Sequence, residues 1–284
     1  MKLFSYSFFE PKQLPDHRTW DKWRAESQRY WFNIPTIALL NKVLHPDYKT
    51  KFYLSPNIFD NPLSDIFNIF DIEYEIIQRE YSFTEPAIWR MMPLWERNIE
   101  IFHARDIDSL TSENEYKYIK TFENSNYSVG TIRSHENHYN LPCRMLAGLC
   151  SFKPNKVPLN IKGFNFDMYY SMKENNYGSD QNLLIKTFTF NQQFTKDNFL
   201  DCKIDRQLNK QDFECVEADL NNIKITENIK AIFDKIKQST NVTWLGEPCD
   251  SRGELTNYLL NMNNDIKLKM LKNKNISSFY KVEK

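Results

Sequence analysis

The chain has 284 residues, of which 41% are hydrophobic and 26% are charged, a composition typical of a globular protein with one large or two modest domains. Its 37 basic and 37 acidic residues give a formal net charge of zero, which argues against a protein that wraps a nucleic-acid backbone. Six glycines argue against a glycine-rich phosphate loop, and five dispersed cysteines without a C-x-x-C pair argue against a disulfide framework or structural zinc.

Targeting signals are not evident in the sequence. Residues 1–9 are too short and too soon followed by charge to be a signal peptide, and no apolar run approaches the roughly 20 residues of a membrane span. Together with the cysteine pattern, these features predict a cytoplasmic protein. The lysine-rich tail from Asp265 is read as a solvated helix, with a peripheral contact to anionic lipid as the alternative.

The first 110 residues alternate short apolar strands with helices, which predicts a mostly parallel sheet with helices on both faces. Asn33 is predicted to cap a helix with Pro35 in its first turn. Ser112 and Glu115 form a predicted capping box for a helix that runs through Phe122. The other predicted elements are strands at 3–9, 51–54, 72–77 and 99–102 and helices from 61 and at 84–95.

The second half is less regular. We predict strands near 127–132 and 145–152, followed by helices near 166–172, 180–188 and 225–236. The chain shows no internal repeat and no Pro/Gly/Ser linker. The pattern therefore predicts an α/β domain at 1–250, followed by a helical, lysine-rich extension at 251–284.

Two aspartates directly follow the fourth predicted strand. Asp106 and Asp108 flank a single isoleucine in the segment F-H-A-R-D-I-D-S, residues 102–109. In an open parallel sheet, ligands bind beyond the carboxyl ends of the strands. A D-x-D turn at this place presents carboxylates to Mg²⁺ or Mn²⁺, which take oxygen ligands and bridge to phosphates. The simpler interpretation is that this segment only caps the following helix.

The order of several motifs along the chain resembles a known family. The most specific motifs are R-D-I-D-S at 105–109 and Y-G-S-D-Q at 177–181. Over residues 1–250 the series looks like the glycosyltransferases of capsule, surface-polysaccharide and large-virus glycan loci. The other matching segments are R-Y-W-F-N at 29–33, K-F-Y at 51–53, W-R-M-M-P-L at 89–94, I-R-S-H-E-N-H at 132–138, M-L-A-G at 145–148 and W-L-G-E at 244–247.

This resemblance implies a GT-A-type nucleotide-sugar fold and transfer of a sugar from a nucleotide-sugar donor to a hydroxyl of a glycan acceptor. It makes Asp108 the principal metal ligand, with Asp106 contacting the metal or the donor and Mn²⁺ or Mg²⁺ on the diphosphate. It places Asp180 at the reactive carbon of the sugar, either as the acceptor base of an inverting reaction or as a positioning group in a retaining one. The simpler role of Asp180 is a helix cap.

Further polar residues are candidate contacts to donor or acceptor. Arg105 pairs either with Asp106 or with a phosphate, since a guanidinium suits bidentate anion recognition. Arg90 lies on a predicted helix at the sheet edge, where a salt bridge is the alternative. His135 and His138 favour hydrogen bonds to phosphate or acceptor over zinc binding. The remaining candidates are Ser5 and Tyr6 toward the nucleotide base (with a core position as the alternative for Tyr6), Arg133 toward a phosphate (with a solvated strand end as the alternative), and Gln181 toward the donor.

The chain departs from the family pattern in two places. Ser134 stands where the family often has aspartate, and Leu200 stands where it has histidine. No histidine follows His138 that would complete a metal shell. Two other functions therefore stay open. One is a catalytically silent glycan- or nucleotide-binding module on the same fold, and the other is a metal-dependent nucleotidyltransferase, against which the scarcity of glycine speaks.

Overall fold

A computed structural model describes residues 1–10, 20–58, 61–81, 85–133, 145–157, 166–173, 178–184, 187–188, 199–203, 216–239 and 254–282. Strands and helices alternate through the first half of the chain, as the sequence predicts. The elements are β1 (Lys2–Phe8), α1 (Trp20–Leu44), β2 (Tyr48–Leu54), α2 (Asn61–Phe70), β3 (Glu73–Ile76), η1 (Glu85–Trp95), β4 (Ile101–Arg105), α3 (Glu113–Asn124), β5 (Val129–Arg133), β6 (Leu149–Phe152), η2 (Pro154–Lys156), α6 (Phe166–Ser171), α7 (Ser179–Leu184), β7 (Phe199–Lys203), β8 (Val216–Glu217), α8 (Glu227–Ser239), α9 (Glu254–Asn261), α10 (Asn264–Lys272) and α11 (Lys274–Phe279).

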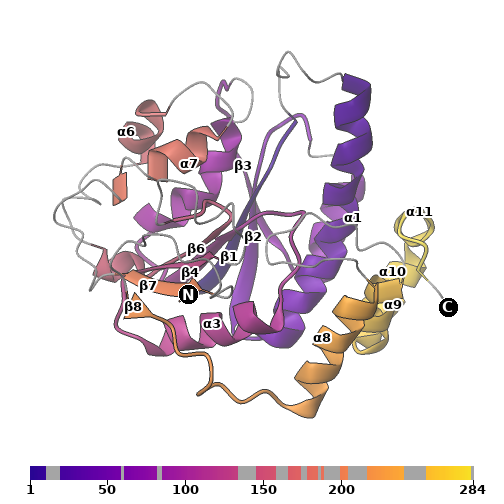
Figure 1. The fold of residues 1–284 in the computed structure, drawn as a ribbon. Coiled ribbons are helices and arrows are strands. Elements are labelled where there is room, and N and C mark those ends of the chain that lie inside the picture. Colours follow the sequence, from indigo (N-terminus) through magenta and orange to yellow (C-terminus); the bar gives the residue numbers. More distant parts are fainter. Residues whose placement is uncertain are drawn as a thin grey trace.

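The described strands form one eight-stranded sheet in the order β3-β2-β1-β4-β6-β5-β7-β8. Strand β6 is antiparallel to both of its neighbours, and every other pairing is parallel. Figure 1 shows helices on both sides of this sheet, with α1 and α8–α11 on one side and α6 and α7 on the other. The predicted mixed α/β architecture, with a mostly parallel sheet and a helical C-terminal extension, is confirmed.

The two faces of the sheet follow from the alternation of side chains along each strand. In β1, Phe4, Tyr6 and Phe8 join the core formed with α1, α2 and α3. Leu3 joins the opposite core, formed with η1, α6 and α7. Ser5 and Ser7 point toward η1, where each hydroxyl bonds a backbone carbonyl. Neighbouring residues of one strand therefore serve different layers of the protein.

Helix α1 differs from its prediction. It begins at Trp20 and continues through Pro35, so Asn33 lies inside the helix and does not cap it. A proline inside a helix frees the carbonyl four residues earlier. That carbonyl, on Trp31, accepts a 2.8 Å hydrogen bond from the hydroxyl of Tyr280. The C-terminal helices thus satisfy the group that Pro35 leaves without an intrahelical partner, and this contact could not be foreseen from the local sequence.

One other element also differs in detail. The segment predicted as an α-helix at 84–95 is the 3₁₀ helix η1, in which Pro86 and Pro93 cannot donate to an i→i−4 ladder. Helix α7 covers Ser179–Leu184, residues 185–186 lie outside the described residues, and residues 187–188 are in a π-helical turn within the predicted range 180–188. The cap at Ser112 is confirmed, since its hydroxyl accepts from the Glu115 backbone N–H at 3.1 Å.

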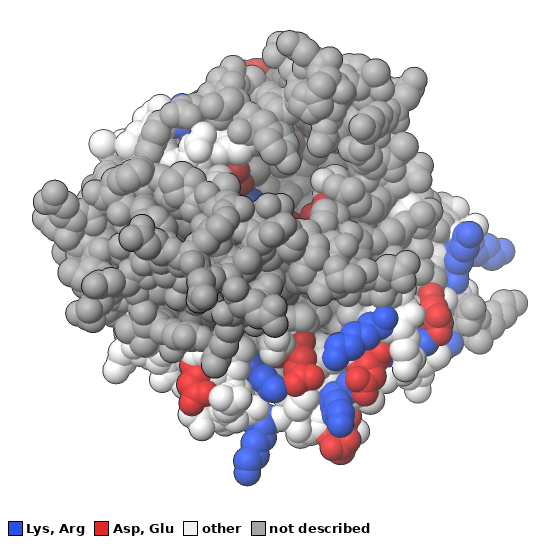
Figure 2. Space-filling model, viewed as in Figure 1, with Lys and Arg blue, Asp and Glu red and all other residues white. Residues whose placement is uncertain are grey.

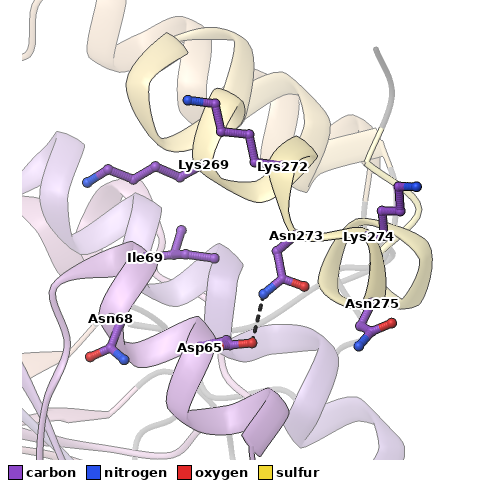
Figure 3. Close-up of a pocket in the computed structure, with 8 residues that line it drawn as sticks. All are labelled: Asp65, Asn68, Ile69, Lys269, Lys272, Asn273, Lys274 and Asn275. Atoms are coloured by element: carbon purple, nitrogen blue, oxygen red, sulfur yellow. Dashed lines mark hydrogen bonds between the residues drawn. The ribbon is translucent and has the colours of Figure 1, made fainter.

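The C-terminal helices pack on α1 and α2. Leu259, Met270 and Ile276 are buried in the same core as α1, and the hydroxyls of Thr36 and Thr256 lie 2.7 Å apart. The predicted boundary at residue 250 falls outside the described residues. A groove of about 480 Å³ lies between α2 and α10–α11. Figure 3 shows Lys269, Lys272 and Lys274 extending from its C-terminal wall in different directions. Those predicted tail lysines are exposed, as expected for a solvated helix.

The described part of the surface carries charges of both signs. Figure 2 shows lysine and arginine alternating with aspartate and glutamate along the edge near α3 and α8. Some of these charges pair along one helix, as Lys117 and Glu113 do at 2.7 Å. None of the described helices is long and apolar enough to cross a membrane.

Two histidines are buried between β1, α1 and α3. His45 and His103 are 1% and 0% exposed. Burial, assisted by the positive charges of Lys120 and Arg105, lowers the pKa of His45 to about 3. Burial and the charge of Arg105 lower the pKa of His103 well below its usual value. Both imidazoles are therefore neutral in the folded protein at and below neutral pH.

This neutrality predicts a loss of stability in mild acid. The unfolded chain protonates both histidines near pH 6.5 and the folded chain does not, so the unfolded state binds more protons below that pH. Between pH 7.5 and 5.5, each buried histidine is expected to lower the free energy of unfolding by about 1 kcal/mol. Urea unfolding of wild type and His103→Gln at both pH values checks this. The variant should lose about 1 kcal/mol less than wild type, and equal losses would contradict the neutral state of His103.

Candidate functional site

The candidate site is built around Arg90, which η1 presents to the sheet. The Ser5 hydroxyl donates to the Arg90 carbonyl at 2.7 Å, and the Arg90 N–H donates to the Ser7 hydroxyl at 2.8 Å. These paired contacts fix η1 on β1, near the carboxyl end of that strand. The Ser5 side chain is fully buried and engaged in this contact. Its position relative to a nucleotide base therefore stays a prediction.

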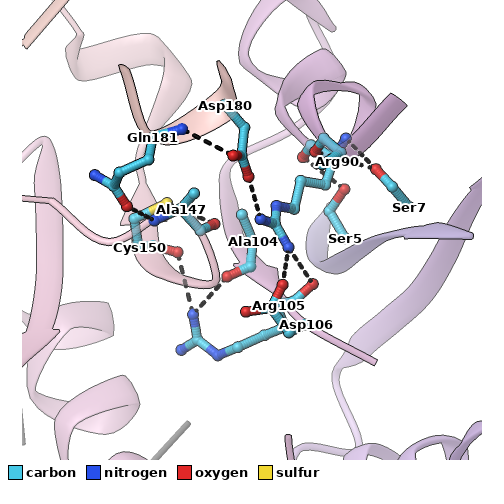
Figure 4. A network of polar contacts seen from close by, with 11 residues as sticks. Ser5, Ser7, Arg90, Ala104, Arg105, Asp106, Ala147, Cys150, Asp180 and Gln181 are labelled. Atoms are coloured by element: carbon cyan, nitrogen blue, oxygen red, sulfur yellow. Dashed lines mark hydrogen bonds and ion pairs between the residues drawn. The ribbon is translucent and has the colours of Figure 1, made fainter. Parts of the chain in front are cut away.

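The guanidinium of Arg90 bridges two of the predicted carboxylates. Its Nη2 donates to Asp180 Oδ2 at 2.6 Å, and its Nη1 forms an ion pair with Asp106 and also donates to the Arg105 carbonyl at 3.3 Å. Figure 4 shows Asp180 and Asp106 on either side of this group. Residues 90, 106 and 180, which lie far apart in the sequence, thus form one cluster, here called the Arg90 cluster.

The electrostatics of the Arg90 cluster favour an ionised arginine. Burial alone would lower the pKa of Arg90, but the charges of Asp106 and Asp180 outweigh it and raise that pKa above its usual value. The Arg90 side chain is 7% exposed, whereas the side chains of Asp180 and Asp106 are 13% and 44% exposed. Two carboxylates share one guanidinium, so the cluster has a net negative charge, and its exposed side is at Asp106.

A backbone turn closes the cluster from the side of β6. A Cβ atom placed on Gly148 would lie 1.8 Å from Asp106 Oδ2, so only glycine allows this carboxylate to approach the turn. The side chain of Gln181 holds the same turn, because its Oε1 accepts from the Ala147 N–H at 3.0 Å and its Nε2 donates to the Met145 carbonyl. Gln181 also donates its own N–H to Asp180 Oδ1 at 2.9 Å. The M-L-A-G and Y-G-S-D-Q segments therefore meet at this site.

Arg105 and Tyr6 lie on the other face of the sheet. Arg105 is 4% exposed and forms a buried ion pair with Glu115, while its Nη1 donates to the carbonyls of Ala104 and Cys150 at 2.9 and 3.2 Å. Tyr6 stacks on Phe52 and accepts from Asn41. Of the pairings predicted for Arg105, the structure thus shows an ion pair, but its partner is Glu115 and not Asp106. The alternative core position of Tyr6 is the one found.

The other predicted site residues are placed as follows. Asp108 lies in the turn after β4 and is 9% exposed. This turn is closed by a 3.4 Å hydrogen bond from the Ser109 N–H to the Asp106 carbonyl. Arg133 is buried at the end of β5. His135 and His138 lie outside the described residues.

Three residues of the site were not among the predicted ones, namely Ser7, Gly148 and Glu115. The alternation of side chains along β1 would have placed Ser7 on the same face as Ser5.

We tested whether the side chains present suit a divalent metal. Among the residues that the structure describes, no three His, Cys, Asp or Glu side chains gather as a ligand set. Mg²⁺ is nevertheless often held by one or two carboxylates plus substrate phosphates and water. The half-exposed Asp106, which is two residues before Asp108 and is part of a cluster with excess negative charge, fits that second arrangement. In addition, the buried Nε of Arg90 has no hydrogen-bond partner among the described residues, so an oxygen of a ligand or water is expected beside it.

Comparisons with known proteins do not assign a family. No protein-family model matches the chain, and no curated protein matches it. One solved structure with partial likeness is 4-diphosphocytidyl-2C-methyl-D-erythritolsynthase from Anaerococcus prevotii, with 11% sequence identity and a TM-score of 0.39. The match covers 84% of this chain and 97% of that one. A likeness at this TM-score gives no basis for assigning an activity, so the class of the protein rests on its own sheet topology.

Proposed function

We propose that this chain is a metal-assisted glycosyltransferase that moves a sugar from a nucleotide-diphosphate-sugar donor to a hydroxyl of a glycan acceptor. The observation that carries the proposal is the Arg90 cluster. It joins four separate motif segments at the carboxyl end of β4, where ligands bind in open parallel sheets. They are four of the eight segments that carry the resemblance to glycosyltransferases, and they include the two most specific ones, R-D-I-D-S and Y-G-S-D-Q.

The residues of the cluster have distinct proposed roles. Asp106 and Asp108 would hold Mn²⁺ or Mg²⁺, which neutralises the charge that develops on the departing nucleoside diphosphate. Arg90 fixes the positions of Asp106 and Asp180 relative to each other. The proposed metal ligand and the carboxylate proposed to face the acceptor are thus held by the same guanidinium. Gln181 couples Asp180 to the turn that contacts Asp106.

Asp180 is the proposed catalytic residue. In an inverting reaction, its carboxylate accepts the proton of the acceptor hydroxyl while that oxygen bonds to the anomeric carbon and the bond to the diphosphate breaks. In a retaining reaction, it instead positions the sugar and stabilises positive charge at the reacting carbon. Its contacts to Arg90 and to the Gln181 N–H orient the carboxylate in both cases.

The test is a thermal-shift panel of nucleoside diphosphates, nucleotide sugars and nucleoside triphosphates, each with and without Mn²⁺. A ligand at a hundredfold its dissociation constant adds about 2.7 kcal/mol, which is several degrees for a chain of this size. We expect one nucleotide sugar to stabilise wild type in the presence of Mn²⁺ and to lose this effect in Asp108→Asn. Asp234→Asn, which changes an exposed carboxylate on α8, is the matched control and should behave as wild type.

The alternatives predict different results in the same panel. A silent binding module would bind the nucleotide sugar without releasing nucleoside diphosphate on incubation with acceptor glycans. A nucleotidyltransferase would respond to a triphosphate and release pyrophosphate. If no nucleotide shifts the melting temperature with or without Mn²⁺, the glycosyltransferase proposal is wrong.

A further inference from the structure

A small cavity lies behind the D-x-D turn, on the face of the sheet opposite the Arg90 cluster. Its volume is about 20 Å³, and it is lined by α1, β1, the end of β4, the turn at residues 109–111 and the first turn of α3. We call it the turn cavity. Its walls include Arg105, Ser109, Thr111 and His45, in addition to apolar side chains of β1 and α1.

Several polar atoms around the turn cavity have no hydrogen-bond partner within the part of the chain that the structure describes. These are Nη2 of Arg105, the hydroxyls of Ser109 and Thr111, and both ring nitrogens of His45, all of which are shielded from solvent. Arg105 and His45 are 4% and 1% exposed. Buried polar groups in folded proteins almost always have a partner, either protein or ordered water. Five such atoms around one void indicate that the void contains a polar molecule.

The charge and size of the cavity identify the molecule. Arg105 is already neutralised by its ion pair with Glu115, and the neutral His45 offers one donor and one acceptor. The walls therefore need a small neutral partner that both donates and accepts. A volume of about 20 Å³ accommodates a water molecule and is too small for a phosphate or a sugar. An apolar cavity of this size would stay empty, but this one is lined by unsatisfied donors and acceptors.

We propose that the turn cavity is a hydration site, in which one or two ordered water molecules connect Arg105 Nη2 to the hydroxyls of Ser109 and Thr111 and to the imidazole of His45. The arrangement anchors the D-x-D turn from behind, because Ser109 directly follows Asp108 and its N–H bonds the Asp106 carbonyl. Thr111 is thus a positioning residue for Asp106 and Asp108. This second step rests on the proposed function, whereas the hydration of the cavity does not.

The first measurement is a crystal structure of the wild-type chain at a resolution that shows ordered solvent. We expect density for water within hydrogen-bond distance of Arg105 Nη2 and of the Thr111 hydroxyl. A cavity without density, or one closed by a shift of the side chains around it, would overturn the hydration site whatever the enzyme does. This measurement needs no variant and no ligand.

The second measurement tests the positioning role. Thr111→Val removes the hydroxyl at nearly constant volume, and Thr111→Ser keeps it. Changes at groups that orient metal ligands typically weaken metal binding by about tenfold or more. We therefore expect Thr111→Val to raise the dissociation constant for Mn²⁺ plus nucleotide sugar about tenfold, with Thr111→Ser close to wild type. Thr121→Val is the control for the same chemical change, because Thr121 is on α3 but does not line the turn cavity.

The outcomes of the two measurements separate the two claims. Water in the cavity with unchanged binding in Thr111→Val would retain the hydration site and overturn the positioning role. If wild type binds no metal–nucleotide pair, the proposed glycosyltransferase fails and the positioning role fails with it, while the crystal structure still decides the hydration of the cavity.

Discussion

Replacing Arg90 by methionine is expected to lower the free energy of unfolding by about 3 kcal/mol near neutral pH. The substitution roughly preserves side-chain volume and leaves Asp180, whose side chain is 13% exposed, next to Asp106 without their shared cation. Removing one partner of a buried ion pair typically costs about 3–5 kcal/mol, because the remaining charge is poorly solvated. We take the lower end, since Asp106 is 44% exposed and water screens its charge.

A double-mutant cycle distinguishes loss of the ion pairs from general loss of packing. The coupling energy between Arg90→Met and Asp180→Asn is expected to be about 2 kcal/mol, and the coupling with Asp106→Asn should be smaller. The order follows from exposure, because the more buried carboxylate gains more from the guanidinium. Urea unfolding of the single and double variants provides the values. Equal couplings below about 0.5 kcal/mol would show that the arginine does not hold the two carboxylates.

Arg90→Lys separates charge from geometry. Lysine retains the positive charge but cannot place two fixed N–H groups toward two carboxylates, as a guanidinium does. We expect this variant to recover about half of the lost stability. It should nevertheless bind metal and nucleotide poorly, because Asp106 and Asp180 are no longer fixed relative to each other. Full recovery of binding in this variant would mean that charge alone matters at this position.

Much of the fold could be predicted from the sequence, because local patterns determine it. The alternation of apolar strands and helices gave the parallel half of the sheet, and Ser112 marked the start of α3 correctly. The path of α1 could not be predicted, since it depends on the contact between the Tyr280 hydroxyl and the Trp31 carbonyl, residues 249 apart in the sequence. The antiparallel position of β6 between β4 and β5 likewise depends on long-range pairing.

The motifs named Arg90, Asp106 and Asp180 separately as candidate site residues, with a salt bridge as the alternative for Arg90. The structure shows that salt bridge and places the three residues in one ion-pair cluster, while their contacts to a ligand stay a prediction. The sequence prediction ignored the two-residue period of a strand, which separates Ser5 from Tyr6 and Asp106 from Arg105. Those pairs face opposite layers, so adjacency in the sequence was a poor guide to adjacency in the site. The partner of Arg105, Glu115, lies on the next helix, where the sequence marked it only as the acidic member of the capping box with Ser112.

Gly148→Ala is expected to impair the site more than the fold. The new Cβ would lie 1.8 Å from Asp106 Oδ2 and 2.5 Å from its Cγ, so the carboxylate must move away from Arg90. Because Asp106 is 44% exposed, it has room to move, and we expect a stability loss of only about 1–2 kcal/mol. The affinity for metal plus nucleotide sugar should fall at least about tenfold, because the displaced group is a proposed ligand.

The control for this prediction is a second glycine whose substitution has a different physical cost. Gly178 has a φ of 79°, and an added Cβ would have no heavy atom of the described residues within 4 Å, so Gly178→Ala introduces backbone strain without a clash with them. Each glycine variant is then combined with Asp106→Ala, which removes the atoms that the methyl group of Gly148→Ala would strike. It should therefore restore most of the stability lost in Gly148→Ala and none of that lost in Gly178→Ala. If Asp106→Ala restores neither variant, the close contact between Gly148 and Asp106 is not what requires glycine at this turn.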